Sequence, residues 1–165
     1  MDNRKIICIL IFLNIFSFSC SNGNKKIHSD EFYMYSSGGD YKRLPLIKPY
    51  VAINSDGQTW VINLSEHSKL GQFSFSNVKK VGLCKDYFFA YCSDSTIFHG
   101  NVVKEAWFVV NPLLKIETGF IKKDEFDSCL NKLKMNYIYL YNIDSVWDKF
   151  NETNYLPFKH DSDIH

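Results

Sequence analysis

An Asp-Gly pair at positions 56–57 separates two runs of β-branched and aromatic residues within residues 50–64. Asp-Gly is favoured in two-residue type I′ turns, because both central residues of such a turn need a positive φ. With that turn, Ile53 pairs with Trp60 across an antiparallel ladder, and alternate side chains share one face. The buried face that this register predicts comprises Val51, Ile53, Trp60, Ile62 and Leu64, and the exposed face comprises Asn54, Thr59 and Asn63.

A second hairpin is predicted from two further apolar runs, at 78–84 and 87–92, which are joined at residues 85–86. A tight turn at this point determines which residues face each other. The pairs expected across this ladder are Val81 with Ala90 and Leu83 with Phe88.

The other strands are assigned from apolar runs and from the turn residues between them. Pro45 and Pro49 keep their segment out of any central strand, since proline cannot donate a hydrogen bond to a ladder. Strands are expected at 32–35, 105–111, 114–118 and 137–143, and loops at 65–72 and 93–104.

Two helices are expected in the C-terminal third of the chain. The first starts near Asp124, and its apolar residues recur at helical spacing at Phe126, Cys129, Leu130 and Leu133. Asp144 can cap a short second helix that buries Val146, Trp147 and Phe150. The expected fold is therefore α+β and mainly antiparallel β: a single domain with one sheet of about six to eight strands, a covering helix near 124–134 and a short helix near 145–151.

The N-terminus has the composition of an export signal. Arg4 and Lys5 form a positive start, and residues 6–18 are apolar apart from Asn14 and Ser17. This run has the length of a signal-peptide core, whereas a membrane-spanning helix needs about 20 apolar residues. An uncleaved membrane helix is therefore disfavoured.

The signal ends in Ser17-Phe18-Ser19-Cys20, which resembles the lipobox of bacterial lipoproteins. It departs from the commonest lipobox at Ser17 and Phe18, where an aliphatic and a small residue are usual. The resemblance implies that Cys20 carries a thioether-linked diacylglycerol and an N-acyl chain such as palmitate, and several acyl chains anchor a protein stably. The alternative is an ordinary cleaved signal peptide in which Cys20 has no special role.

These features divide the chain into a signal peptide (1–19), a flexible tether (20–31), one globular domain (32–152) and a C-terminal tail (153–165). The expected location is the bacterial cell envelope, with a lipid anchor in the outer membrane rather than in the inner one.

The charge of the mature chain is balanced. Without residues 1–19 it has seventeen basic and seventeen acidic side chains, so no basic surface is expected to bind nucleic acid. Membrane attachment is expected through the lipid on Cys20.

Three further cysteines allow at most one disulfide in an oxidising compartment. Cys84 and Cys92 lie at opposite ends of the second predicted ladder, too far apart to bond to each other. Together with Cys129, they are interpreted as small buried apolar residues.

No motif for catalysis or for cofactor binding occurs. The sequence lacks the G-x-S-x-G, H-E-x-x-H, C-x-x-C, P-loop and Rossmann glycine patterns. The charged side chains at 160–165 lie in a short tail that does not preorganise metal ligands. We therefore expect no catalytic residue, no metal site and no cofactor.

Two triplets, Asp94-Ser95-Thr96 and Asp144-Ser145-Val146, resemble an O-glycosylation signal that some bacteria use on exported proteins. Ser95 and Ser145 are the candidate sites. The second triplet has an alternative explanation as the start of the predicted short helix.

The order of features also resembles an uncharacterised family of small bacterial lipoproteins, from which no activity can be inferred. The resemblance rests on the lipidated start, the hairpin at 78–91, the strand at 106–111 and the helix opened by Asp124-Glu125-Phe126. The sequence favours a noncatalytic envelope lipoprotein that binds a protein or a cell-surface ligand, as immunity and inhibitor proteins do, through exposed aromatic residues. A structural component of an envelope complex and a small envelope enzyme are the alternatives.

Overall fold

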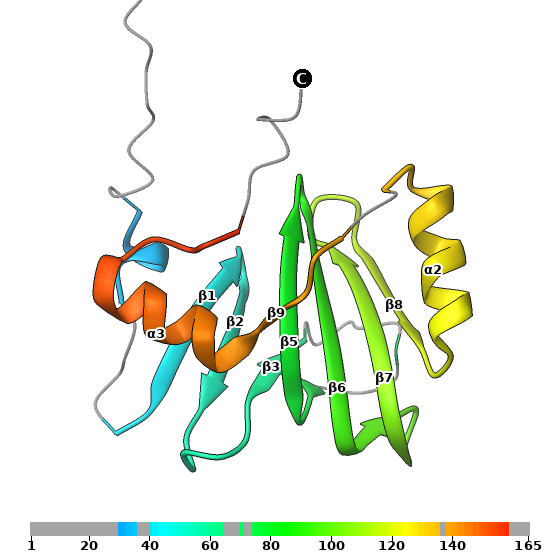
Figure 1. Cartoon of the computed structure of the whole chain (residues 1–165), viewed down its shortest axis with the longest axis horizontal. Helices are drawn as coiled ribbons and strands as arrows, with labels where there is room; N and C mark the ends of the chain where they lie inside the picture. The colour runs from blue at the N-terminus through cyan, green and yellow to red at the C-terminus, as the bar shows by residue number, and fades with distance from the viewer. Residues whose placement is uncertain (1–29, 36–39, 65–69, 71–73, 136–137, 159–165) are drawn as a thin grey trace, which may run out of the picture.

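Two antiparallel sheets and two α-helices pack together in the residues that the computed structural model describes, which are 30–35, 40–64, 70, 74–135 and 138–158 (Figure 1). The first sheet has the order β1-β2-β3-β4, with β1 Lys42–Ile47, β2 Tyr50–Asn54, β3 Val61–Asn63 and β4 Ser74–Phe75. The second has the order β8-β7-β6-β5-β9, with β5 Val78–Cys84, β6 Tyr87–Phe98, β7 Asn101–Asn111, β8 Ile116–Phe120 and β9 Tyr141–Asn142. The helices are the 3-10 helix η2 Glu31–Tyr33, α2 Lys123–Lys132 and α3 Ile143–Thr153. The α+β, mainly antiparallel fold class is confirmed, whereas the expectation of one sheet is wrong, because the strands divide into sheets of four and five.

The main core lies between the two sheets. Phe75 of β4 stacks on Phe108 of β7 with 3.7 Å between ring centroids, and Tyr50 packs on Phe88 at 5.1 Å. α3 closes one side of this core, since it contacts β1 and β5 and buries Phe150. Burial of these aromatic side chains supplies a large part of the favourable free energy of folding.

A second, smaller core lies on the opposite face of the five-stranded sheet. Successive side chains of a strand point to opposite faces, so Phe89 and Trp107 face away from the first sheet. They are covered by Phe126 and Leu130 of α2, which lie one turn apart. The predicted covering helix is therefore confirmed, with bounds one or two residues from those expected.

The register predicted for the first hairpin is wrong by one residue. Ile53 pairs with Val61 rather than with Trp60, because the strands are joined by a longer loop and not by a two-residue turn. The Asp56 carboxylate accepts hydrogen bonds from the backbone N–H groups of Gln58 and Thr59, at 2.8 and 2.6 Å. A shift of one residue exchanges the faces of a strand: Ala52 and Asn54 are buried, and Val51 and Ile53 are half-buried.

The second hairpin has the predicted register. Val81 pairs with Ala90 and Leu83 with Phe88. Lys85 takes a positive φ of 54° in the turn. The tight turn expected at residues 85–86 was therefore sufficient to predict this pairing.

The loop predicted at 93–104 is wrong. β6 and β7 continue through it and meet at a tight turn in which His99 and Gly100 both have positive φ, 47° and 78°. The hairpin tip is exposed, with Ile97 and Val102 directly paired. Residues 93–96 and 104–105 are polar, which interrupts the alternating apolar pattern from which strands are predicted, although Phe98 and Val103 pack against the main core.

Two predicted strands are replaced by other structure. The expected strand at 32–35 overlaps η2 at residues 32–33. This helix is capped by Asp30, whose carboxylate accepts from the Phe32 N–H at 3.0 Å. Of the strand expected at 137–143, residue 137 lies outside the described residues, and only Tyr141–Asn142 form a strand, because residues 138–140 pass over Gly82 of β5 before β9 begins and Ile143 starts α3.

Smaller differences occur at other element ends. β8 starts two residues later than expected, after a turn in which the Asn111 side chain accepts from the Leu114 N–H at 2.9 Å. α3 starts at Ile143 and is capped by Asn142 rather than by Asp144. At its end, Leu156 and Phe158 pack against the main core, so packed structure extends beyond the expected domain boundary at 152. Pro45 lies in the edge strand β1, as its chemistry requires.

Candidate functional site

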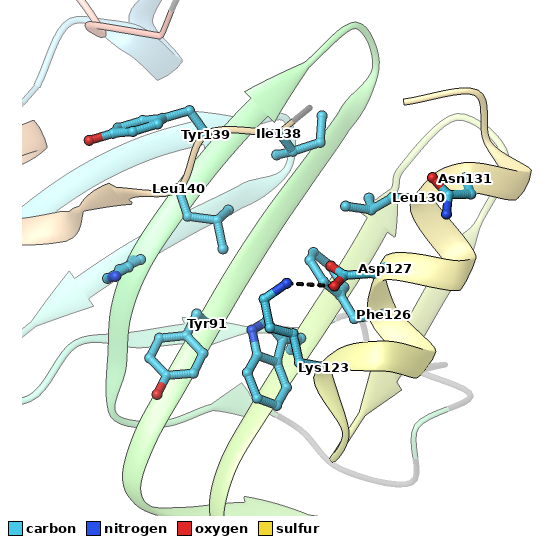
Figure 2. Close-up of a pocket in the computed structure, with 11 residues that line it drawn as sticks. Tyr91, Lys123, Phe126, Asp127, Leu130, Asn131, Ile138, Tyr139 and Leu140 are labelled. Carbon is cyan, nitrogen blue, oxygen red and sulfur yellow. Dashed lines mark hydrogen bonds and ion pairs between the residues drawn. The ribbon is translucent and has the colours of Figure 1, made fainter. Parts of the chain in front are cut away.

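A groove of about 660 Å³ opens on the outer face of the five-stranded sheet, between α2 and residues 138–140 (Figure 2). Its floor is formed by Tyr91 of β6 and Trp107 of β7, whose ring centroids are 5.2 Å apart. Its apolar walls are Phe126 and Leu130 from α2 and, opposite them, Ile138 and Leu140; its polar or exposed lining residues are Lys80, Lys123, Asp127, Asn131 and Tyr139.

The wall opposite α2 depends on a glycine. A Cβ on Gly82 of β5 would lie 2.7 Å from the backbone oxygen of Tyr139 and 3.1 Å from Leu140 Cδ2. Only a residue without a side chain lets the 138–140 segment cross the strand this closely. Gly82 therefore determines where the second wall of the groove lies.

The rim of the groove carries charges of both signs. Lys123 and Asp127 form an ion pair one helical turn apart on α2, at 2.5 Å, as the dashed line in Figure 2 shows. The ammonium of Lys80 lies 5.9 Å from the centroid of the Tyr91 ring, close enough for a cation–π interaction. A ligand in the groove would thus meet an aromatic floor, aliphatic walls and charged or amide groups at the entrance.

The phenol of Tyr91 is held in its neutral form. Burial and the hydrogen bond that its hydroxyl donates to Glu105, at 3.0 Å, raise the pKa of Tyr91 above its usual value. A neutral phenol that already donates to a carboxylate is not available as a general base. The chemistry of this floor suits contact and stacking.

The three cysteines of the domain are free thiols. Cys84 and Cys92 are buried and Cys129 is half-buried. Cys84 pairs with Tyr87 and Cys92 with Val78, at opposite ends of the ladder, as predicted. Burial raises the pKa of Cys92 to about 12 and raises that of Cys129, so both thiols are poor nucleophiles at neutral pH.

Of the residues singled out from the sequence, Cys20 is outside the described residues, and Ser95 and Ser145 do not line the groove. Ser95 is in β6 within the irregular stretch between Ser93 and Thr96. Ser145 is exposed in the first turn of α3, where its N–H donates to Asn142 Oδ1 at 3.1 Å, which agrees with the alternative explanation of its triplet as a helix start.

Metal-ligand clusters and membrane-spanning helices are both absent from the described part of the chain. There, no group of three or more His, Cys, Asp or Glu side chains is placed to hold a metal ion. No helix within those same residues combines the length and hydrophobicity that crossing a bilayer requires.

Comparison with protein-family models, with curated proteins and with solved structures finds no match to this chain. The groove is therefore interpreted from its own geometry. Sequence reasoning did not identify it, although the correct β5–β6 register already places Tyr91 and Phe89 on one face. The missing information was the position of α2 and of the segment that crosses Gly82.

Proposed function

We propose that this chain is a noncatalytic, lipid-anchored envelope protein, and that it binds its partner in the groove between α2 and residues 138–140. The observation that carries the proposal is the groove itself, with its aromatic floor and mixed-charge rim. Clefts of this size with apolar walls and a few polar groups are the usual form of a ligand site. Tyr139 on its rim is 71% exposed, and exposed tyrosines supply large contact areas at low entropic cost.

The partner that this surface suits is a protein segment or a cell-surface ligand with both apolar and charged groups. Immunity or inhibitor activity is one concrete form of the proposal. In this form, the surface around the groove binds a toxin or a wall-degrading enzyme and blocks its activity. In that form, the purified chain inhibits the enzyme at equal concentration.

Site-specific photo-crosslinking in cells tests the groove. A photoreactive phenylalanine analogue is placed at Tyr139 or Asn131, in the groove, and at Leu113 or Lys149, which are exposed elsewhere. The two groove positions are expected to yield the same discrete product and the two control positions to yield none. Equal labelling at all four positions, or none at the groove, contradicts the proposal.

The anchor is tested separately. Cells are grown with labelled palmitate and fractionated, for the full chain and for Cys20→Ala. The full chain is expected to be labelled and to sediment with membranes, and Cys20→Ala is expected to lose both properties. Labelling that persists in Cys20→Ala contradicts the lipid assignment.

A further inference from the structure

Two basic side chains, Arg43 of β1 and Lys48 directly after it, bind the first described residues, and we call this pair the cationic clamp. One guanidinium nitrogen of Arg43 donates to the backbone oxygens of Phe32 and Tyr35, at 2.9 Å each. The guanidinium also lies 5.2 Å from the centroid of the Phe32 ring. Lys48 forms an ion pair with Asp30 at 2.5 Å. The chain that leads to the proposed lipid therefore leaves the domain from a fixed point.

Exposed apolar side chains gather at this point. Met34 is 48% exposed, Tyr35 59% and Tyr41 37%. Tyr35 is held beside Arg43 by the hydrogen bond to its backbone oxygen. Tyr41 stands directly before β1, two residues from Arg43. Met34, Tyr35 and Tyr41, which we call the junction patch, are thus the exposed large apolar side chains of the two segments that Arg43 joins, 30–35 and 40–47.

The junction patch lies close to any lipid on Cys20. Residues 20–29 separate that cysteine from the described domain, and ten extended residues reach at most about 35 Å. A short tether of this kind gives the patch a high effective concentration at the membrane surface. Tyrosine is also the type of side chain that favours the interface, where its ring is buried among lipids and its hydroxyl stays in water.

We propose that the junction patch is a bilayer-contacting surface that rests in the headgroup region of the anchoring membrane. This inference rests on the proposed lipid anchor and adds an orientation to it. In Figure 1, η2 lies at one end of the longest axis and α2 at the other. Contact through the patch therefore places the groove at the end of the domain far from the bilayer, where a partner in solution or on another surface can reach it.

Fluorescence quenching by bromine-labelled lipids tests the contact. The lipidated full chain is reconstituted in vesicles of phosphatidylethanolamine, phosphatidylglycerol and brominated phosphatidylcholine. Three variants each add one tryptophan: Tyr35→Trp and Tyr41→Trp in the junction patch, and Leu113→Trp, which is 74% exposed in the turn before β8. The emission of the added tryptophan is obtained by subtracting the spectrum of the parent chain.

The two patch variants are expected to lose emission as the brominated fraction rises, and Leu113→Trp is expected to keep it. If the patch variants are quenched no more than Leu113→Trp while the chain is acylated and retained on vesicles, the inference is overturned and the anchor stands. A parent chain that is neither acylated nor retained overturns both proposals together.

Discussion

The indole nitrogen of Trp60 donates a hydrogen bond to the Asp144 carboxylate, at 2.8 Å, across 84 positions of sequence. Trp60 ends the loop between β2 and β3 and is only 2% exposed. Its backbone oxygen accepts from the N–H of Val78 at the start of β5. One residue thus joins the first sheet, the second sheet and the first turn of α3.

Removal of that carboxylate leaves a buried donor without its partner. Asp144→Ala is expected to lower the free energy of unfolding by about 1–2 kcal/mol, the usual cost of an unsatisfied buried group. Asp144→Asn keeps an acceptor oxygen and is expected to lose less. Urea denaturation followed by tryptophan fluorescence measures both.

The matched control is Asp148→Ala, one turn further along the same exposed side of α3. It is expected to change stability by no more than about 0.5 kcal/mol, as most surface substitutions do. Equal losses for Asp144→Ala and Asp148→Ala would show that the bond to Trp60 contributes nothing specific.

The two hairpins explain which parts of the fold were predictable. In the second hairpin the two strands meet at a tight two-residue turn, so Val81 and Ala90 pair as expected. In the first hairpin the side chain of Asp56 binds two backbone N–H groups and builds a longer loop. A pattern of apolar residues carries no information about such hydrogen bonds between a side chain and the nearby backbone, which compete with the hydrogen bonds of a regular turn.

The groove was only partly predictable. The helical spacing of Phe126 and Leu130 identified the face of α2 that is buried. The pairing of distant segments did not follow from spacing, since it depends on a close backbone approach at Gly82. A lone glycine in a strand is consistent with several causes, including a bulge.

The close contact between Gly82 and the backbone of Tyr139 leads to a direct prediction. Gly82→Ala places a methyl group 2.7 Å from the Tyr139 backbone oxygen, so residues 138–140 must move. We expect a loss of about 1–3 kcal/mol, the usual cost of overpacking, together with faster amide hydrogen exchange across 138–142. Unchanged exchange in this segment would contradict its assigned place over β5.

The clamp at Arg43 is testable by proteolysis. Arg43→Ala removes both hydrogen bonds to the backbone oxygens of Phe32 and Tyr35 and is expected to speed cleavage at residues 30–35. Arg43→Lys keeps the charge without the planar guanidinium and is expected to restore only part of the protection. Lys79→Ala, which removes an exposed ion pair with Asp94, serves as the control and is expected to leave cleavage unchanged.

The buried thiol of Cys92 predicts how stability depends on pH. Burial raises its pKa to about 12 from an ordinary value of 9.0, with a hydrogen bond to Thr96 opposing the shift. Between these values the unfolded chain releases a proton that the native chain keeps, so the free energy of unfolding falls as pH rises. The expected contribution is at most about 1.4 kcal/mol per pH unit. Cys92→Ala should remove it, so that urea denaturation at pH 8 and pH 10 gives a smaller loss for the variant than for the parent. A cavity left by the substitution lowers the free energy of unfolding of the variant equally at both pH values, so it does not affect this comparison. If the free energy of unfolding falls by the same amount in the two chains, Cys92 has the same pKa in the folded and unfolded states, and the prediction is wrong.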